Sequence, residues 1–182
     1  MKSSRSNFTL SGVPSHLIAI GGMGESKLLI KSCEIFSVAT NSWAELPELN
    51  TARDTPGCIL LESKRAFCFC GLKPTGICSN SIERLDTAKW KTLPLNHQIQ
   101  KTLHLGAGLF LGEIVVFGGT SYTPSITYKF SEEGDLLADL SAQSDIPEEM
   151  RSGVFTIENG KIYVFNKKSD CALEVFDGKS WS

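Results

Sequence analysis

The sequence predicts an all-β protein made of four copies of one unit, each a set of four short strands. Three observations lead to this prediction. Short apolar runs that end in glycine or a polar substitute recur about every 48 residues, and a second short run follows each of them. No stretch has the apolar pattern expected of a long helix. With 182 residues, the chain has the size of about one domain.

Each unit begins with two short strands. The second strand is the apolar run, and glycines end it in the first three units: Gly21 and Gly22, Gly71, Gly118 and Gly119. The residues directly before this ending are Ile20, Cys70, Phe117 and Phe165. The first strand precedes it after a short turn, and connections such as 111–113 and 158–161 are typical of hairpins. A basic residue stands a few positions before each first strand: Arg5, Arg53, Lys101 and Arg151.

The third and fourth strands complete the unit. The third strands are short runs that mix charged, apolar and aromatic residues: 34–37, 83–86, 128–131 and 174–177. A tryptophan follows in three of the four units: Trp43, Trp90 and Trp181. A Leu-Pro pair follows the first two tryptophans by four residues in both cases, whereas the third unit has lost its tryptophan. The repeats therefore span approximately 5–52, 53–100, 101–150 and 151–182.

The order of a basic residue, a strand, a strand ending in Gly-Gly, a Glu-apolar-aromatic run and Trp-x2-Leu-Pro resembles the kelch repeat. The resemblance covers nearly the whole chain and is most complete in the first unit. Kelch repeats of about 50 residues form the four-stranded blades of a β-propeller. The resemblance therefore implies a kelch-type β-propeller of about four blades, with residues 1–182 forming a single kelch-repeat domain.

The recurring glycine, tryptophan and basic residues are expected to be structural. Glycine permits unusual backbone angles and leaves room for a bulky neighbour. Tryptophan supplies a large apolar surface that can pack between blades, and the basic residue can donate hydrogen bonds to loop carbonyls. The predicted repeat anchors are Gly21, Gly22, Trp43, Gly71, Trp90, Gly118, Gly119 and Trp181.

The chain is short for this fold, because the resemblance implies a closed ring and kelch propellers have five to seven blades. Three alternatives stay open on the sequence. The chain is a piece of a larger protein, two chains self-associate to complete a ring, or four blades close into a ring alone. A stack of blades that does not close exposes an apolar face at each end unless something caps it.

Composition narrows the class of protein further. Eighteen Lys and Arg against 20 Asp and Glu give a net charge of -2, which argues against a nucleic-acid partner. No apolar run approaches a membrane span of about 18 residues, and no signal peptide is recognisable, so we expect a cytoplasmic protein without a membrane partner. The six cysteines are then expected to be reduced, buried thiols, because the spacing typical of zinc ligands is absent.

The sequence predicts no catalytic residues, no metal site and no cofactor. His16, His97 and His104 do not have the spacing of metal ligands, and no known nucleophile or phosphate-binding motif occurs. The acidic pairs at 132–133 and 148–149 fall in polar loops, where solvated carboxylates are the rule. We therefore expect a protein that is not an enzyme.

Binding is the natural use of this architecture, because the loops at the ends of the strands vary while the sheets pack. The resemblance implies that protein partners lie against the loops between second and third strands and between units. Candidate partner-binding residues in these loops are Arg53, Lys101, Arg151 and Tyr122. If the three cations converge, they would hold an acidic segment. The predicted function is a non-catalytic scaffold or substrate-recognition domain, as a ubiquitin-ligase adaptor or a cytoskeletal protein; the alternative is a propeller enzyme acting on a small sugar or metabolite.

Overall fold

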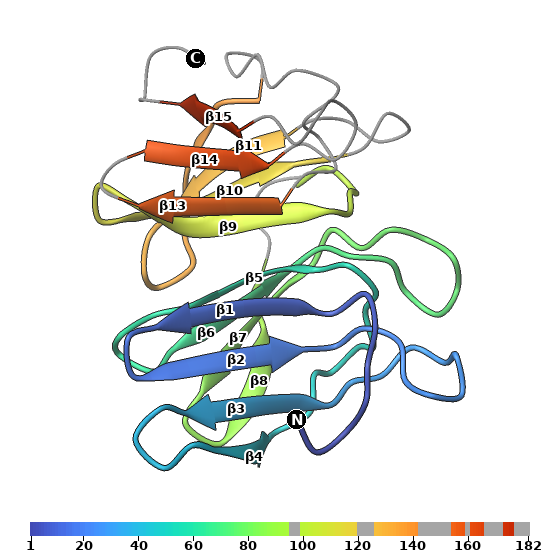
Figure 1. The fold of residues 1–182 in the computed structure, drawn as a ribbon. Coiled ribbons are helices and arrows are strands. Elements are labelled where there is room, and N and C mark those ends of the chain that lie inside the picture. The colour runs from blue at the N-terminus through green and yellow to red at the C-terminus, as the bar shows by residue number, and fades with distance from the viewer. Residues whose placement is uncertain (95–98, 120–125, 142–153, 159–160, 166–172, 177–182) are drawn as a thin grey trace. The chain divides into compact units, whose positions relative to one another are not determined.

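The computed structural model describes residues 1–94, 99–119, 126–141, 154–158, 161–165 and 173–176. The chain divides into two compact units, Met1–Leu103 and His104–Ser182, and each is treated by itself below. All regular elements in the described ranges are β-strands (Figure 1). Within these ranges, no helix is long and apolar enough to cross a bilayer.

The first unit contains two antiparallel sheets of four strands, and in each sheet the strands pair in chain order. The strands of the first sheet are β1 (Thr9–Val13), β2 (His16–Ile20), β3 (Cys33–Ser37) and β4 (Ser42–Leu46). Those of the second sheet are β5 (Gly57–Leu60), β6 (Ala66–Phe69), β7 (Ile82–Asp86) and β8 (Lys89–Thr92). The first strands of the two sheets, β1 and β5, contact one another.

The second unit repeats this plan. Its four-stranded sheet consists of β9 (Leu105–Phe110), β10 (Glu113–Gly118), β11 (Ile126–Phe130) and β12 (Leu136–Asp139). The described residues of the last sheet form β13 (Val154–Glu158), β14 (Lys161–Phe165) and β15 (Leu173–Phe176). Here too the first strands of the two sheets, β9 and β13, are in contact. The predicted all-β fold of four-stranded blades is therefore confirmed, and strands form in all four predicted units.

The structure corrects the alignment of the second repeat by one residue. Gly21 and Cys70 both have positive φ angles, +61° and +53°, and their amides donate to Ser32 and Ser81 respectively. Cys70 therefore occupies the position of Gly21, so the glycine pair of the first repeat corresponds to Cys70 and Gly71. The sequence obscured this match because a cysteine rarely adopts a left-handed conformation.

The core of the first unit lies between its two sheets. Period-two alternation sends Ile18, Ile20 and Cys33 to one side of the β1–β4 sheet, because their register partners share that side. These side chains pack against Leu85 and Trp90 of the β5–β8 sheet. All five side chains are buried, so the apolar side of one blade covers the next.

Candidate functional site

The basic residue of the second repeat, Arg53, lies inside the protein. It is fully buried, and its Nη2 donates to Oε1 of Glu83 at 2.8 Å. Its Nη1 also donates to the carbonyl oxygens of Cys70 at 2.6 Å and Ser81 at 3.0 Å. The guanidinium thus ties the start of β5 to the end of β6 and the start of β7.

The first repeat contains the same cluster. Arg5 Nη2 donates to Oε1 of Glu34 at 2.6 Å, and its Nη1 donates to the carbonyl oxygens of Gly21 and Ser32 at 3.2 and 2.8 Å. The expectation that the basic residue bonds loop carbonyls is confirmed for Arg5 and Arg53. These buried charges are tolerated because each is paired and hydrogen-bonded.

In each cluster, backbone amides also donate hydrogen bonds to the glutamate carboxylate. The Glu34 carboxylate accepts from the amides of Lys2 at 2.5 Å and Ser3 at 3.1 Å. Burial by itself would raise the pKa of Glu34, but the Lys2 amide and the Arg5 guanidinium outweigh it, so the pKa is lowered. Glu83 likewise accepts from two amides on the segment that leads to Arg53, Asn50 at 2.6 Å and Thr51 at 3.3 Å.

The expectation that Arg53 binds an acidic partner segment is wrong. Its side chain has no exposed surface, and its partner carboxylate, Glu83, belongs to the same blade. Of the other candidates, Lys101 has an exposed side chain. Arg151 and Tyr122 lie outside the described residues, so the proposed convergence of the three cations stays untested.

Sequence reasoning missed the two glutamates that complete these clusters. The signal was present, because the Arg and Glu are 29 residues apart in the first repeat and 30 in the second. The third repeat has other residues in the positions of both the arginine and the glutamate. Lys101 stands in the basic position, and strand register places Tyr128 where Glu34 and Glu83 stand.

The predicted glycine anchors stand where side chains are excluded. At Gly71, with φ +88°, a Cβ would lie 2.8 Å from the carbonyl oxygen of Asp54. At Gly118, with φ +128°, it would lie 2.6 Å from that of His104. Gly21, Gly22 and Gly119 also have positive φ angles. Close backbone approach, together with the left-handed angle, explains the choice of glycine.

The two described tryptophan anchors differ in their surroundings. Trp90 is 3% exposed, and its Nε1 donates to the carbonyl oxygen of Pro47 in the preceding blade at 2.9 Å. Trp43 is only half-buried, and its ring lies 5.3 Å from that of Phe36 in the same sheet. Trp181 lies outside the described residues.

The thiols lie mainly in the core. Cys33, Cys58, Cys68 and Cys70 are buried, Cys78 is half-buried, and Cys171 lies outside the described residues. Burial raises the pKa of Cys33, Cys68 and Cys70 to about 12. Within the part of the chain that is described, no group of three or more His, Cys, Asp and Glu side chains could hold a metal ion.

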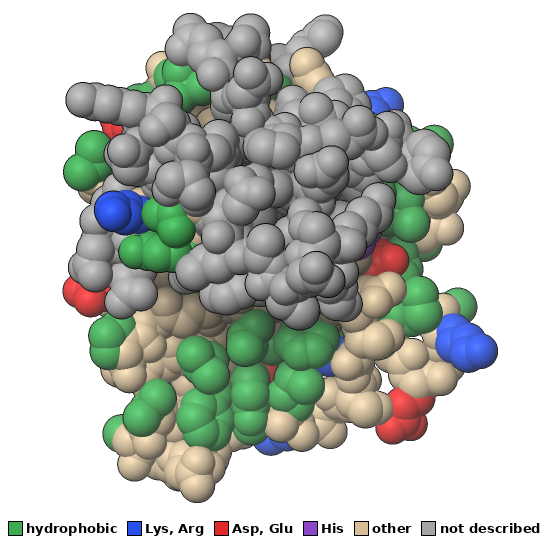
Figure 2. All heavy atoms as spheres, turned by 45° about the horizontal axis from the view of Figure 1, so that its top comes forward, with side chains coloured by type: hydrophobic (Ala, Val, Ile, Leu, Met, Phe, Trp, Pro, Cys, Tyr) green, Lys and Arg blue, Asp and Glu red, His purple; other side chains and the backbone are tan. Residues whose placement is uncertain are grey.

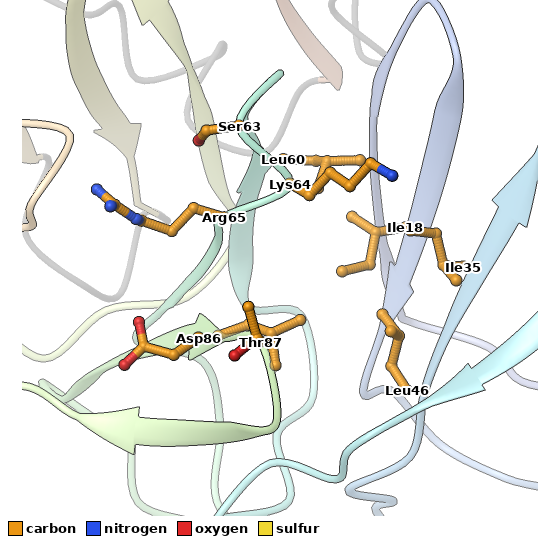
Figure 3. Close-up of a pocket in the computed structure, with 10 residues that line it drawn as sticks. Ile18, Ile35, Leu46, Leu60, Ser63, Lys64, Arg65, Asp86 and Thr87 are labelled. Carbon is orange, nitrogen blue, oxygen red and sulfur yellow. The ribbon is translucent and has the colours of Figure 1, made fainter.

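A cavity of about 420 Å³ opens between the two sheets of the first unit, at the end that carries the β5–β6 and β7–β8 turns (Figure 3). Its apolar walls are Ile18, Ile35 and Leu46 on one sheet and Leu60 and Leu85 on the other. These are the same residue types that fill the core, and the cavity is a widening of the seam between the blades.

Polar residues form the rim of this cavity. Lys64 and Arg65 come from the β5–β6 turn. Asp86, at the end of β7, also lies on the rim. Its carboxylate accepts from Lys91 Nζ at 2.6 Å and from Arg84 Nε at 3.0 Å. The hydrogen bond from Lys91 is the main reason that the pKa of Asp86 is lowered. Because its charge is held by two cations, Asp86 is suited to fixing a turn rather than to accepting protons.

The opposite end of the first unit carries two matching loops, which project from the right-hand end of the sheets in Figure 1. In the β2–β3 loop, the Gly24 amide bonds the Leu28 carbonyl and the Lys27 amide bonds the Gly24 carbonyl. In the β6–β7 loop, Lys73, Gly76 and Ile77 make the same two bonds. Both loops are therefore small hairpins of one design.

The tip of each hairpin exposes an aliphatic side chain. Leu28 is 67% exposed and Ile77 is 56% exposed. They occupy the same position in the two repeats, because each carbonyl accepts the bond that closes its hairpin. Exposed lysines stand near them in the sequence, at Lys27 and Lys31 in the first loop.

Comparison with known proteins agrees with this repeat structure. Residues 4–50 match the kelch motif. A segment of 53 residues is 38% identical to Kelch domain-containing protein 8B of Homo sapiens and of Pongo abelii, and 36% identical to that of Mus musculus. The matched segment is 29% of this chain and covers only 15% of the length of each of these relatives.

The match to the kelch motif therefore covers the first blade, and the second blade, the β5–β8 sheet, repeats the strand order of the first. The buried Arg53–Glu83 ion pair likewise repeats the Arg5–Glu34 ion pair. The first blade therefore carries a kelch motif, and the same blade and the same buried ion pair recur directly beyond the matched residues.

Proposed function

We propose that this chain is a non-catalytic protein-interaction module that binds its partner through the β2–β3 and β6–β7 loops. The observation that carries the proposal is the exposure of Leu28 and Ile77 at equivalent hairpin tips. Backbone hydrogen bonds close both hairpins. The two side chains thus do not make the bonds that close the loops, and loops held on a rigid scaffold are where binding residues concentrate.

The charge around these tips favours an acidic partner segment. Lys27 and Lys31 are exposed on the first loop, and Lys101 is exposed on the segment that follows the second blade. Exposed carboxylates near them are Glu25 and Glu48. A partner with an aliphatic side chain flanked by acidic residues would complement this mixture of apolar and basic groups.

Two finer roles are consistent with this proposal, a substrate-recognition domain of a ubiquitin ligase and a cytoskeletal binding protein. Both need a docking surface for a protein, and they differ in which proteins the loops hold. The alternative, a propeller enzyme acting on a small sugar or metabolite, finds no supporting observation in the described residues. His16, for example, bonds only its neighbour Ser15 through Nδ1 at 2.9 Å.

The test is affinity capture from cell extract with quantitative mass spectrometry, using three versions of the full chain. These are the natural chain, the double variant Leu28→Ser with Ile77→Ser, and the control Val38→Ser. Val38 is 53% exposed and lies beyond β3, at the opposite end of the sheet. All three should fold equally well, because exposed substitutions usually change stability by less than about 0.5 kcal/mol.

We expect a set of proteins that the natural chain and Val38→Ser hold and that the double variant loses. Ubiquitin-ligase subunits with their substrates in this set would favour the first finer role, and actin or its associated proteins would favour the second. If the double variant holds the same proteins as the control, the loop tips are not the docking surface and the proposal is wrong.

A further inference from the structure

The cavity between the two sheets of the first unit coincides with a break in the repeat. In each sheet, strand register pairs one residue of the second strand with one of the third, at the same position relative to the glycine or its substitute that ends the second strand. Three sheets pair an aliphatic residue with phenylalanine: Leu17 with Phe36, Ile114 with Phe130, and Ile162 with Phe176. In the second blade the pair is Ala66 with Leu85, and both residues are smaller than their counterparts.

This smaller pair leaves space where the two blades meet. Ala66 and Leu85 belong to the core that the two sheets share, and Leu85 is part of the cavity wall. Protein interiors are close-packed, and an unfilled apolar space lowers stability because the atoms around it lose contacts. The cavity of about 420 Å³ is within the usual size range of small-molecule sites. An apolar molecule that fills it would restore the missing contacts.

The walls of the cavity are suited to an aliphatic chain. Ile18, Leu60 and Leu85 are buried at its inner end, whereas Ile35 and Leu46 are half-buried. None of these five side chains can form a hydrogen bond with a polar ligand. All lining residues belong to the first unit. Hydrophobic side chains also gather on the outer face shown in Figure 2, so apolar surface by itself does not distinguish this site. The cavity differs because two sheets enclose it and a cation stands at its mouth.

That cation is Lys64, in the β5–β6 turn. The turn is closed by backbone hydrogen bonds from the Leu61 amide to the Arg65 carbonyl and from the Lys64 amide to the Leu61 carbonyl. The Lys64 side chain lines the cavity, is exposed, and points toward the β1–β4 sheet in Figure 3. It makes no ion pair with a residue that the structure describes. Its ammonium group is therefore available to an anion, while its methylene stem extends the apolar wall.

The carboxylate on the rim does not cancel this charge. Asp86 lines the cavity as well, but its charge is held by Lys91 and Arg84. A molecule that carries one carboxylate on an aliphatic chain therefore complements both parts of the site, the apolar walls and the cation at the mouth.

We propose that this cavity binds a free medium-chain aliphatic carboxylate of the decanoate type, with the chain between the two sheets and the carboxylate at Lys64 Nζ. The small Ala66–Leu85 pair makes room for the chain. The site lies at the end of the first unit opposite to the hairpin tips Leu28 and Ile77. It is therefore distinct from the proposed protein-docking loops, and neither proposal depends on the other.

Equilibrium dialysis of the full chain with decanoate, below the concentration at which micelles form, tests the proposal. We expect saturable binding of one decanoate per chain, with affinity rising up to about fourfold for each methylene group from hexanoate to decanoate. Lys64→Met keeps an apolar stem but removes the charge. It should weaken decanoate binding several-fold and leave the binding of decanol unchanged.

Lys27→Met is the matched control. Lys27 is also an exposed lysine with a positive φ angle, +59° against +63° at Lys64, but it lies in the β2–β3 loop at the opposite end. This variant should bind decanoate like the natural chain. Equal weakening in Lys27→Met and Lys64→Met would mean that the carboxylate has no fixed site, and would overturn the proposal.

A second variant tests the origin of the cavity. Ala66→Leu with Leu85→Phe restores the pair found in the other sheets, and it should abolish the binding of both decanoate and decanol. Decanoate should raise the thermal midpoint of the natural chain and not that of this variant. If the filled variant does not fold, Lys64→Met still decides, because its position is exposed. Full decanoate binding by a folded filled variant, or no saturable binding by the natural chain, would also overturn the proposal.

Discussion

Nη2 of Arg53 lies 2.8 Å from Oε1 of Glu83, and neither side chain has any exposed surface. The pair repeats the contact of Arg5 with Glu34 at 2.6 Å in the preceding blade. In each blade it joins the segment before the first strand to the third strand, across the end of the second. The ion pair is thus a fixed part of the blade.

Removing one half of this pair should be strongly destabilising. Glu83→Leu leaves the Arg53 guanidinium buried without its counter-ion, a change that typically costs about 3–5 kcal/mol. Adding Arg53→Met to this variant should recover part of the loss, because no charge is then left unpaired. Chemical denaturation of the two variants measures the difference.

The surface pair of Lys91 and Asp86 provides the control for this experiment. Lys91→Met should cost less than about 1 kcal/mol, because exposed ion pairs contribute little. If Glu83→Leu is as mild as Lys91→Met, the buried cluster does not hold the blade together.

The two tryptophans should differ in their contribution to stability. Trp90→Ala should lower the free energy of unfolding by about 3–5 kcal/mol, because it empties a buried site and leaves the Pro47 carbonyl without its donor. Trp43→Ala should cost clearly less, since its ring is already half exposed. Equal losses in urea unfolding of the two variants would mean that the two sites are packed alike.

Substitutions at Gly118 and Gly112 distinguish the stability cost of steric exclusion from that of backbone strain. Both have positive φ angles, +128° and +82°, but a Cβ at Gly112 meets nothing within 4 Å. Gly112→Ala should therefore cost about 1 kcal/mol, the strain of a left-handed residue. Gly118→Ala should cost more, because its Cβ would meet the His104 carbonyl oxygen at 2.6 Å. Thermal unfolding of both variants checks the order, which would be reversed or absent if close approach did not matter.

The buried thiols should react slowly and make stability fall at high pH. Burial raises the pKa of Cys33, Cys68 and Cys70 to about 12, whereas an unfolded thiol ionises near 8.5. Between these values the unfolded chain has lost protons that the folded chain retains. Each such thiol should therefore reduce stability by about 1.4 kcal/mol per pH unit, from about pH 9 towards 12.

Alkylation followed by mass spectrometry and unfolding at several pH values test this prediction. At pH 8 the half-buried Cys78 should be labelled before Cys33, Cys68 and Cys70. Replacing Cys68 by Ala should make the decline of stability with pH shallower, and an unchanged slope would contradict the proposed cause.

Much of the blade could be predicted from the sequence because its signals are local. Alternating apolar residues, the turns between strands and the glycines after the second strand act over a few residues. The strand positions and the carbonyl bonds of Arg5 and Arg53 followed from them. The repeat pattern places Cys70 one residue away from its true position, which matches Gly21. The left-handed backbone angle of Cys70 is imposed by the surrounding hydrogen bonds and not by its own preference.

The repeating four-stranded unit and its anchor residues could be identified from the order of amino acids, because their signals are local. The folded chain was needed to show that Arg53 is a buried structural cation and that Trp43 and Trp90, which match in the repeat, differ in burial. Local pattern fixes which side of a strand a residue faces. Burial depends on which other surface packs against that side, and this is set by contacts between residues far apart in the chain.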